Sequence, residues 1–207
     1  MISNNDPLAM LNVSRETIAS LEQLVLMMKK WNPAINLVSR STVADAWHRH
    51  ILDSAQILAL APDAARQWAD LGSGGGFPGL VIAILAKELR PLMKVTLVEA
   101  DQRKATFLRQ ASQSFSLAAD VLPMRIEATA PLAADVVSAR ALAPLPALCG
   151  FALRHLGSTG VALFMKGAAH DAEIAEARKV WVMDMEVHPS VTDPKAVILK
   201  VKGLSHV

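Results

Sequence analysis

The sequence predicts an α/β fold: a mostly parallel, seven-stranded sheet preceded by a short helical segment. Three observations support this. Strand-like apolar runs alternate with helical patterns from Gln67 onward. The first strand leads into a glycine-rich turn at residues 72–79 and then an apolar helix. Two alternating strand patterns stand close together near the C-terminus, which is typical of an antiparallel hairpin. Alternation of strands and helices indicates parallel strands joined by helical crossovers.

Length and composition limit which classes of protein this chain can belong to. The 207 residues suit a helical appendage over residues 1–62, packed on a main domain over residues 63–207. A net charge of +2 permits an anionic partner without requiring one. The single cysteine, Cys149, excludes a disulfide framework and a cysteine-based zinc site. The N-terminus lacks the pattern of a signal peptide and no apolar run is long enough to span a bilayer, so we expect a cytoplasmic protein without a membrane partner.

Residues 14–60 are expected to form two helices. Ser14 is the candidate N-cap of the first, which carries one apolar stripe made of Ile18, Leu21, Leu24, Val25 and Met28. The asparagines and the proline within residues 31–37 predict a break. The second helix is expected to begin near Thr42, with Asp45 as a capping-box-like acid. Its buried face would consist of Trp47, Ile51, Ala55 and Leu58.

A polar pair, His50 and Asp53, lies on that second helix. The two residues are three apart and therefore side by side, while Arg49 and Asp53 have the spacing of an ion pair. They could form an acid–base couple or half a metal site, hold the appendage to the glycine turn, or contact substrate. With no third ligand candidate nearby we predict no metal site, and the polar connection is the favoured interpretation.

The glycine turn fits two cofactor chemistries. Residues 74–79 satisfy the dinucleotide pattern G-x-G-x-x-G, with Glu99 twenty residues beyond its last glycine. Asp70, Gly72, Gly74 and Gly76 instead satisfy the acid-x-G-x-G-x-G pattern of a site for S-adenosylmethionine (SAM). A pyrophosphate is bound by helix amides without a carboxylate beside it, whereas the ammonium group of SAM would be drawn to Asp70. The acid therefore favours SAM over a dinucleotide.

Four polar residues are expected at the carboxyl ends of strands, where open α/β sheets bind ligands. Glu99 ends the strand 94–99, where it either accepts hydrogen bonds from ribose hydroxyls or is a solvated strand end. Glu127 follows a strand at 121–126 and Arg140 follows a strand at 135–139. Arg140 would bind a substrate phosphate or pair with an acid of the pocket. Lys166 follows a fifth strand, 160–165.

The remaining elements complete the sheet. A helix over 103–118 is expected to bury Phe107, Leu108, Ala111 and Phe115. Its outer face offers Arg103, Lys104 and Arg109, which would face solvent or touch phosphate. A further helix should begin after Pro144, and strands at 180–187 and 196–202 should form the terminal hairpin. A seven-stranded sheet with such a hairpin is the outline of a Rossmann-like class I SAM-dependent methyltransferase.

Several short motifs occur together in one order. They are Trp31-Asn32, Asn36-Leu37, His50-Ile51-Leu52-Asp53-Ser54, Asp70-Leu71-Gly72-Ser73-Gly74 with Phe77-Pro78-Gly79, Phe107-Leu108, Ser138-Ala139-Arg140-Ala141 and Lys166-Gly167. In this combination the chain resembles the bacterial family of small-subunit ribosomal RNA guanine-N7 methyltransferases known as RsmG or GidB, from about residue 25 to residue 200. The resemblance implies transfer of a methyl group from SAM to N7 of one guanine in 16S ribosomal RNA, in a loop near the decoding site.

The resemblance also implies site residues. The cofactor would be bound by Gly72, Phe77, Ile126, Glu127 and Arg140, supported by Gly74 and Glu99. For the RNA, the sequence suggests Arg103, Arg140, Lys166 and His50, with Lys29 and Lys30 next. Gly75 departs from the alanine or proline common in the family, and a third consecutive glycine should loosen the turn. Tyrosine is absent, so base stacking would fall to Phe or Trp.

The implied chemistry requires no catalytic residue. Guanine N7 has an in-plane lone pair and no proton, so attack on the methyl group needs no general base. The partner would be 16S ribosomal RNA or the small ribosomal subunit, and we expect a monomer. Three alternatives remain at this point: a SAM-dependent methyltransferase for a small molecule or a protein, a dinucleotide oxidoreductase, and a non-catalytic RNA-binding module.

Overall fold

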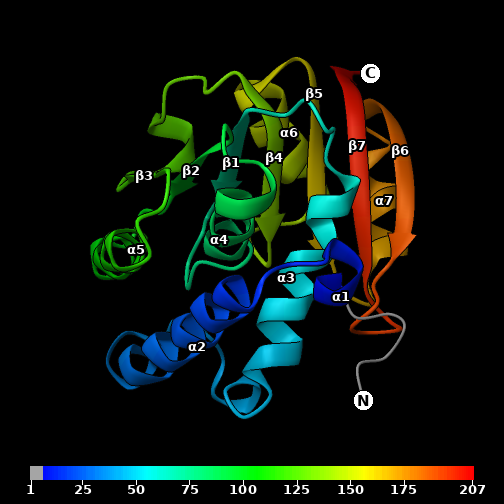
Figure 1. Cartoon of the computed structure of the whole chain (residues 1–207). Helices are drawn as coiled ribbons and strands as arrows, with labels where there is room; N and C mark the ends of the chain where they lie inside the picture. The colour runs from blue at the N-terminus through cyan, green and yellow to red at the C-terminus, as the bar shows by residue number, and fades with distance from the viewer. Residues whose placement is uncertain (1–6) are drawn as a thin grey trace.

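The computed structural model describes residues 7–207 as one seven-stranded sheet with helices on both faces (Figure 1). The strand order is β3-β2-β1-β4-β5-β7-β6. The strands from β3 to β5 pair in parallel, and β7 runs antiparallel to both β5 and β6. The predicted sheet and its terminal antiparallel hairpin are therefore confirmed. The first six residues of the predicted appendage lie outside the described residues.

The strands are β1 (Gln67–Leu71), β2 (Lys94–Val98), β3 (Ala119–Leu122), β4 (Ala134–Arg140), β5 (Leu156–Lys166), β6 (Trp181–Pro189) and β7 (Val197–His206). The helices of the main domain are α4 (Gly79–Leu89), α5 (Gln102–Ser114), the 3₁₀ turn η4 (Ile126–Ala128), α6 (Leu145–His155) and α7 (His170–Ala177). The N-terminal segment contains α1 (Pro7–Leu11), α2 (Arg15–Ile35), η1 (Arg40–Thr42), η2 (Trp47–Leu52), α3 (Asp53–Ala55) and η3 (Gln56–Leu60). Within residues 7–207, no helix is both long and apolar enough to cross a membrane.

Two differences from the predicted elements affect the site. The third strand ends at Leu122 instead of Ile126, because Pro123 cannot donate to the strand ladder. Ile126 and Glu127 consequently lie in the turn η4 beyond the strand. The short helix α7 was not predicted, since half of its residues are exposed and its apolar pattern is weak.

The helix α2 begins as predicted, and its end falls inside the predicted break. The Ser14 hydroxyl accepts a hydrogen bond from the Thr17 amide, which confirms the N-cap. The break expected within residues 31–37 falls at Asn36, whose φ of 49° is left-handed. Pro33 is accommodated inside the helix, and the buried Asn32 accepts a hydrogen bond from the Val38 amide at 2.8 Å. Asn32 thus stabilises the turn that leaves the helix.

The second predicted helix is irregular. The Thr42 hydroxyl donates to the Ser39 carbonyl at 2.8 Å instead of forming a capping box with Asp45. The chain then forms a π-helix, η2, before a single α-turn and a 3₁₀ turn. Ile51, Ala55 and Leu58 are buried as expected, and Trp47 is half-buried. Because π-helical turns are frequent at functional sites, this irregularity draws attention to η2.

The N-terminal segment shares a hydrophobic core with one face of the sheet. Fully buried side chains of α2, such as Leu21 and Met28, belong to the same cluster as residues of α4 and of β2. In Figure 1, α2 and α3 lie below α4 and α5, and the helices α6 and α7 cover the opposite face. The segment therefore packs against the main domain, and the boundary at residue 62 stays a prediction.

One exposed carboxylate joins α2 to α4. Glu88 on α4 accepts hydrogen bonds from the Ser14 amide and hydroxyl at 2.9–3.1 Å, and another from the Thr17 hydroxyl. These hydrogen bonds, with that from Thr17 the largest contribution, hold the pKa of Glu88 below its usual value. A carboxylate at a helix N-terminus also interacts favourably with the helix dipole.

We expect Glu88→Ala to lower the free energy of unfolding by about 0.3–1 kcal/mol, the range for an exposed charge at a helix terminus. A folded-state pKa below the unfolded value of 4.5 stabilises the fold above that pH and loses this effect as the pH falls through the folded-state pKa. Urea unfolding at pH 7 and pH 3 should therefore show a difference between wild type and variant only at pH 7. The control is Glu22→Ala, on the exposed face of α2; equal losses in both variants would contradict the assigned role.

Candidate functional site

The glycine turn between β1 and α4 places its backbone at the edge of a cavity. Gly72 and Gly74 have φ values of +66° and +54°, which favour glycine. A Cβ on Gly72 would lie 2.5 Å from Leu142 Cδ1, so the turn also needs the small residue for close packing. Gly75 has a different role from the one expected: a Cβ there would lie 2.8 Å from the Leu37 carbonyl oxygen. The third glycine lets the N-terminal segment pack on the turn.

The turn is held from beneath by Asp70, the last residue but one of β1. Its side chain is 1% exposed; Oδ1 accepts from the Ser138 hydroxyl at 2.7 Å and Oδ2 from the Gly79 amide at 3.2 Å. Burial raises the pKa of Asp70 to about 6, although these hydrogen bonds oppose the shift. Both oxygens are engaged inside the fold and Asp70 is not among the residues that line the cavity above, so its contact with the SAM ammonium group stays a prediction.

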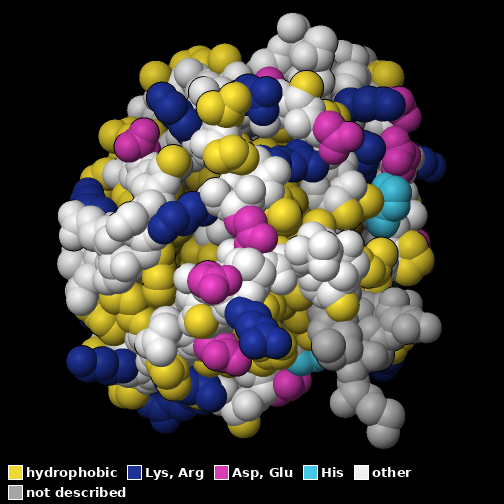
Figure 2. Space-filling view, in the orientation of Figure 1, with side chains coloured by type: hydrophobic (Ala, Val, Ile, Leu, Met, Phe, Trp, Pro, Cys, Tyr) yellow, Lys and Arg dark blue, Asp and Glu magenta, His cyan; other side chains and the backbone are white. Residues whose placement is uncertain are grey.

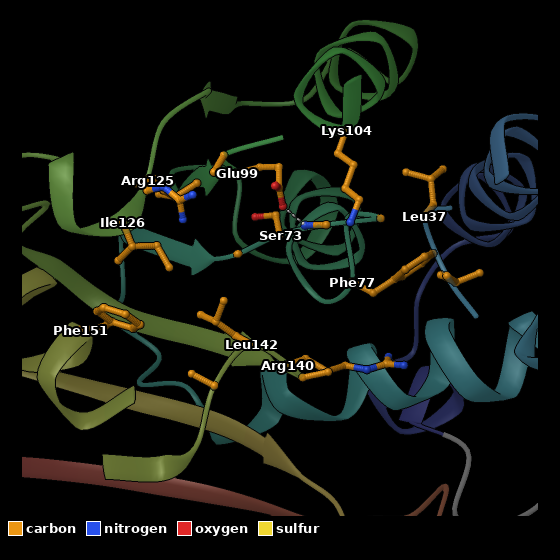
Figure 3. Close-up of a pocket in the computed structure, with 18 of the residues that line it drawn as sticks. Leu37, Ser73, Phe77, Glu99, Lys104, Arg125, Ile126, Arg140, Leu142 and Phe151 are labelled. Carbon is orange, nitrogen blue, oxygen red and sulfur yellow. Dashed lines mark hydrogen bonds between the residues drawn. The ribbon is translucent and has the colours of Figure 1, made fainter. Parts of the chain in front are cut away.

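A cavity of about 650 Å³ opens beside the glycine turn (Figure 3). This volume lies within the range of about 300–1,000 Å³ of small-molecule sites. All seven residues predicted to bind cofactor line it, and so does His50: the set is Gly72, Gly74, Phe77, Glu99, Ile126, Glu127, Arg140 and His50. The structure therefore brings together residues from the turn and from the ends of β2, η4 and β4.

Glu99 connects the end of β2 to the glycine turn. One of its oxygens accepts a hydrogen bond from the Gly74 amide at 2.7 Å, drawn as a dashed line in Figure 3, and the other accepts from the Asp101 amide at 2.8 Å. Each carboxylate oxygen can accept a second hydrogen bond. Glu99 is therefore an ordered acceptor at the cavity wall.

Sequence reasoning missed several lining residues. Leu142 and Phe151, which were not predicted, form an apolar side of the cavity together with the predicted Ile126, opposite Leu37 and Phe77 (Figure 3). Lys104, expected on the outer face of its helix, reaches the cavity from α5. No local pattern singles out Leu142 or Phe151, because their position depends on how β4 and α6 meet. The Asn36-Leu37 motif was a signal for the contribution of the N-terminal segment.

His50 joins the N-terminal segment to the cavity. Its ring is 3% exposed and stacks on Phe77, with centroids 4.9 Å apart. His50 Nδ1 lies 2.8 Å from Arg140 Nη2, and Nε2 lies 2.9 Å from the Thr42 hydroxyl. Burial lowers the pKa of His50 to about 4, with Arg140 and Arg49 adding to the shift. Because a guanidinium only donates, the neutral ring accepts from Arg140 at Nδ1.

Arg140 pairs with the other member of the polar pair. Its Nη1 lies 3.1 Å from Asp53 Oδ2. His50 and Asp53 therefore connect the N-terminal segment to the glycine turn, which is one of the roles left open for them. Arg140 forms an ion pair with a nearby acid, which is one of the roles left open for it. The expected pairing of Arg49 with Asp53 is wrong: Arg49 pairs with Asp193 at 3.0 Å, because the turn between β6 and β7 packs beside η2.

The candidate RNA-binding cations differ in exposure. Lys166 is paired with Glu173 at 2.6 Å, donates to the Ala143 carbonyl and has a side chain only 9% exposed, so its charge is balanced inside the fold. Arg103 is exposed, 3.6 Å from Asp101, and Lys29 and Lys30 are exposed on α2. Figure 2 shows basic and acidic side chains interspersed over the face it presents.

Known proteins similar to this chain point to one family. Residues 17–200 match the GidB family model, described as rRNA small subunit methyltransferase G. The chain is 55% identical over 200 residues to the "Ribosomal RNA small subunit methyltransferase G" of Cereibacter sphaeroides, covering 97% of each protein. It is 50% identical over 197 residues to the protein of that name from Ruegeria pomeroyi, covering 95% of this chain and 96% of the relative.

Solved structures show the same fold at low sequence identity. A TehB-like SAM-dependent methyltransferase from Corynebacterium glutamicum aligns with a TM-score of 0.53 at 18% identity, over 72% of this chain and 86% of that one. A SAM-dependent methyltransferase from Aquifex aeolicus gives 0.56 at 11% identity, over 76% and 91%. The predicted class I methyltransferase fold is confirmed. Since the family model spans most of the chain and the relatives match nearly all of it, the chain belongs to the rRNA small subunit methyltransferase G family.

Proposed function

We propose that this chain transfers the methyl group of SAM to N7 of one guanine in 16S ribosomal RNA, in a loop near the decoding site. The observation that carries the proposal is the 650 Å³ cavity, which gathers every residue predicted to bind cofactor. Membership of a family of ribosomal RNA methyltransferases supports the reaction and the class of substrate. The base and its position follow from the motifs that gave the family resemblance.

The residues of the cavity fit SAM. Gly72 and Gly74 present backbone without side chains, and the nearest atom to a Cβ on Gly74 would be 3.7 Å away, so a ligand can approach this backbone. Glu99 would accept hydrogen bonds from ribose hydroxyls. Ile126, with Leu142 and Phe151, would cover the apolar faces of the adenine. Phe77, Glu127 and Arg140 would complete the binding site.

The residues of the chain position SAM and the guanine and do not transfer a proton. SAM provides a methyl group on a positively charged sulfur, and guanine N7 attacks it without losing a proton. His50 does not serve as a base, because both ring nitrogens are engaged by Arg140 and Thr42. Orientation of two reactants can lower a barrier by at most about 7–11 kcal/mol. The carboxylates of Glu99 and Glu127 would favour the positive charge that the guanine gains.

We also propose a location, an oligomeric state and a substrate for this protein. It acts in the cytoplasm, as a monomer, on 16S ribosomal RNA or the small ribosomal subunit. Mapping of methylated guanines by primer extension in a deletion strain tests the reaction: one guanine N7 site should lose its methyl group and regain it with the purified protein and SAM. Methylation of small amines but not of ribosomal RNA would favour the alternative methyltransferase.

We expect Gly72→Asp to abolish SAM binding, because the new side chain would collide with Leu142 and add a negative charge at the cavity. Isothermal titration measures the affinity. Gly203→Asp is a matched control, since Gly203 has a similar φ of +62° and open space around the added Cβ. A folded Gly72→Asp protein with the affinity of wild type would remove this turn from the cofactor site.

We expect Glu99→Ala to weaken SAM binding by about 1–3 kcal/mol, because ribose hydroxyls and the Gly74 amide lose a charged acceptor. Titration with SAM should show weaker binding by the variant than by wild type. Titration with NADH should show no binding by either protein. Glu99→Gln should fall between wild type and Glu99→Ala. Equal SAM affinities would limit Glu99 to its hydrogen bonds with the Gly74 and Asp101 amides.

We expect Arg103→Ala to flatten the salt dependence of RNA binding by about 0.7–0.9 in the slope of log affinity against log salt, the effect of one lost phosphate contact. Lys166→Ala should leave that slope unchanged, because Lys166 is buried against Glu173. RNA binding measured from low to high salt distinguishes the two. A flattened slope in Lys166→Ala would show that its charge does reach the RNA.

A further inference from the structure

A second cavity, of about 380 Å³, lies next to the first. Arg140 and Ala141 line both cavities and therefore form the wall between them. The other walls come from Glu173 of α7 and from three segments: residues 49–56 of the N-terminal segment, residues 165–167 at the end of β5, and residues 190–198 around the turn between β6 and β7. Arg140 extends from the end of β4 toward the N-terminal helical segment (Figure 3).

Hydrogen bonds fix the walls of this second cavity. Gln56 accepts from the Val191 amide at 3.0 Å and donates to the Ser190 hydroxyl at 3.1 Å. The Thr192 hydroxyl donates to Asp53 Oδ1 at 2.8 Å. The turn between β6 and β7 is thus tied to the N-terminal segment, and the cavity is formed before any ligand binds.

A guanidinium donor and a carboxylate acceptor stand side by side at the shared wall. Within residues 7–207, Arg140 Nη1 is buried and forms no hydrogen bond, although it lies 3.1 Å from Asp53 Oδ2. The side-chain hydrogen bonds that Asp53 accepts from Gln56 and Thr192 both go to Oδ1. An N–H group and a carboxylate oxygen are therefore in contact without good hydrogen-bond geometry. Both side chains line the second cavity, so a ligand there meets a guanidinium donor beside a carboxylate acceptor.

The order of these two groups matches one edge of guanine. With N7 turned toward the cofactor cavity, O6 is the neighbouring acceptor, and the N1–H donor follows next along the ring. Arg140, on the shared wall, can donate to O6, and Asp53, behind it, can accept from N1–H. Adenine in the same orientation presents an amino donor to Arg140 and an unprotonated N1 to Asp53, so both contacts would be mismatched.

We propose that the second cavity holds the target guanine, and that Arg140 and Asp53 select it by hydrogen bonds to O6 and N1–H. The inference rests on the proposed function. Sequence-specific RNA recognition uses unstacked bases of single-stranded loops, whose Watson–Crick edges can be read in a pocket. Arg140 then contacts the substrate from one side and the cofactor cavity from the other, and Asp53 is a specificity-determining residue.

Base analogues test the inference on the wild-type protein. Small ribosomal subunits are reconstituted with 16S ribosomal RNA that carries guanosine, inosine or 2-aminopurine at the target position. Inosine keeps O6 and N1–H, so kcat/KM should stay within about threefold of guanosine. 2-Aminopurine keeps N7 but lacks both groups, so kcat/KM should fall by about 5–150-fold, the effect of one lost bidentate base contact. Similar rates with guanosine and 2-aminopurine would overturn the inference.

Variants separate base reading from a structural role. At saturating SAM, Asp53→Asn should lower kcat/KM for guanosine at least about tenfold and change that for 2-aminopurine far less, because 2-aminopurine does not use the carboxylate. Equal losses on both bases would mean that Asp53 only positions its neighbours, which contradicts the proposal. The matched control is Asp63→Asn: Asp63 is an exposed partner of an arginine, Arg90, outside both cavities, and its variant should keep both rates.

The two proposals fail in different ways. If the wild-type protein methylates no guanine N7 in 16S ribosomal RNA, the proposed function is wrong. If it methylates that atom but does not distinguish guanosine from 2-aminopurine, the proposed function stands and the assignment of Arg140 and Asp53 is wrong.

Discussion

The buried carboxylate of Asp70 is the contact on which the site depends. It accepts hydrogen bonds from Ser138 on β4 and from the first amide of α4, so it fixes both ends of the glycine turn against the sheet. A Cβ on Gly79 would lie 2.6 Å from Asp70 Oδ2, which makes this glycine necessary for the contact. Because the folded-state pKa of about 6 lies above the unfolded 3.8, ionisation of Asp70 costs stability as the pH rises through this range. Asp70 thus costs stability in its ionised form, but its hydrogen bonds order the glycine turn.

Much of this arrangement could be predicted from local sequence. The strand, turn and helix around residues 68–86 follow from apolar patterns and glycines, and the terminal hairpin follows from alternation. A polar connection through His50 could be predicted but its partner could not, because Arg140 lies 90 residues away in the sequence. The same holds for Leu37, whose carbonyl lies beside Gly75 in a contact between residues 38 positions apart in the sequence. The family resemblance named Ile126 and Glu127, but Pro123 moved them from a strand end into a turn.

The irregular segment from η2 to η3, residues 47–60, shows how tertiary contacts override a helical pattern. Its sequence has the apolar spacing of a regular helix, and the buried side chains of Ile51, Ala55 and Leu58 follow that spacing. Three polar contacts are satisfied along it at the same time: His50 with Arg140, Asp53 with Thr192, and Gln56 with Ser190. The π-helical turn at residues 47–52 is the backbone conformation in which these three contacts are formed. It connects the N-terminal segment, the glycine turn and the C-terminal hairpin around one arginine.

The position of Arg140 on a wall shared by two cavities has a thermodynamic consequence. One guanidinium serves both sides, so a ligand that reorients it in one cavity changes the free energy of binding in the other. Such linkage is reciprocal: whatever factor the nucleotide applies to the affinity for the methyl donor, the donor applies to the affinity for the nucleotide. The sign of this coupling free energy determines whether the two ligands assemble cooperatively or whether departure of one promotes release of the other.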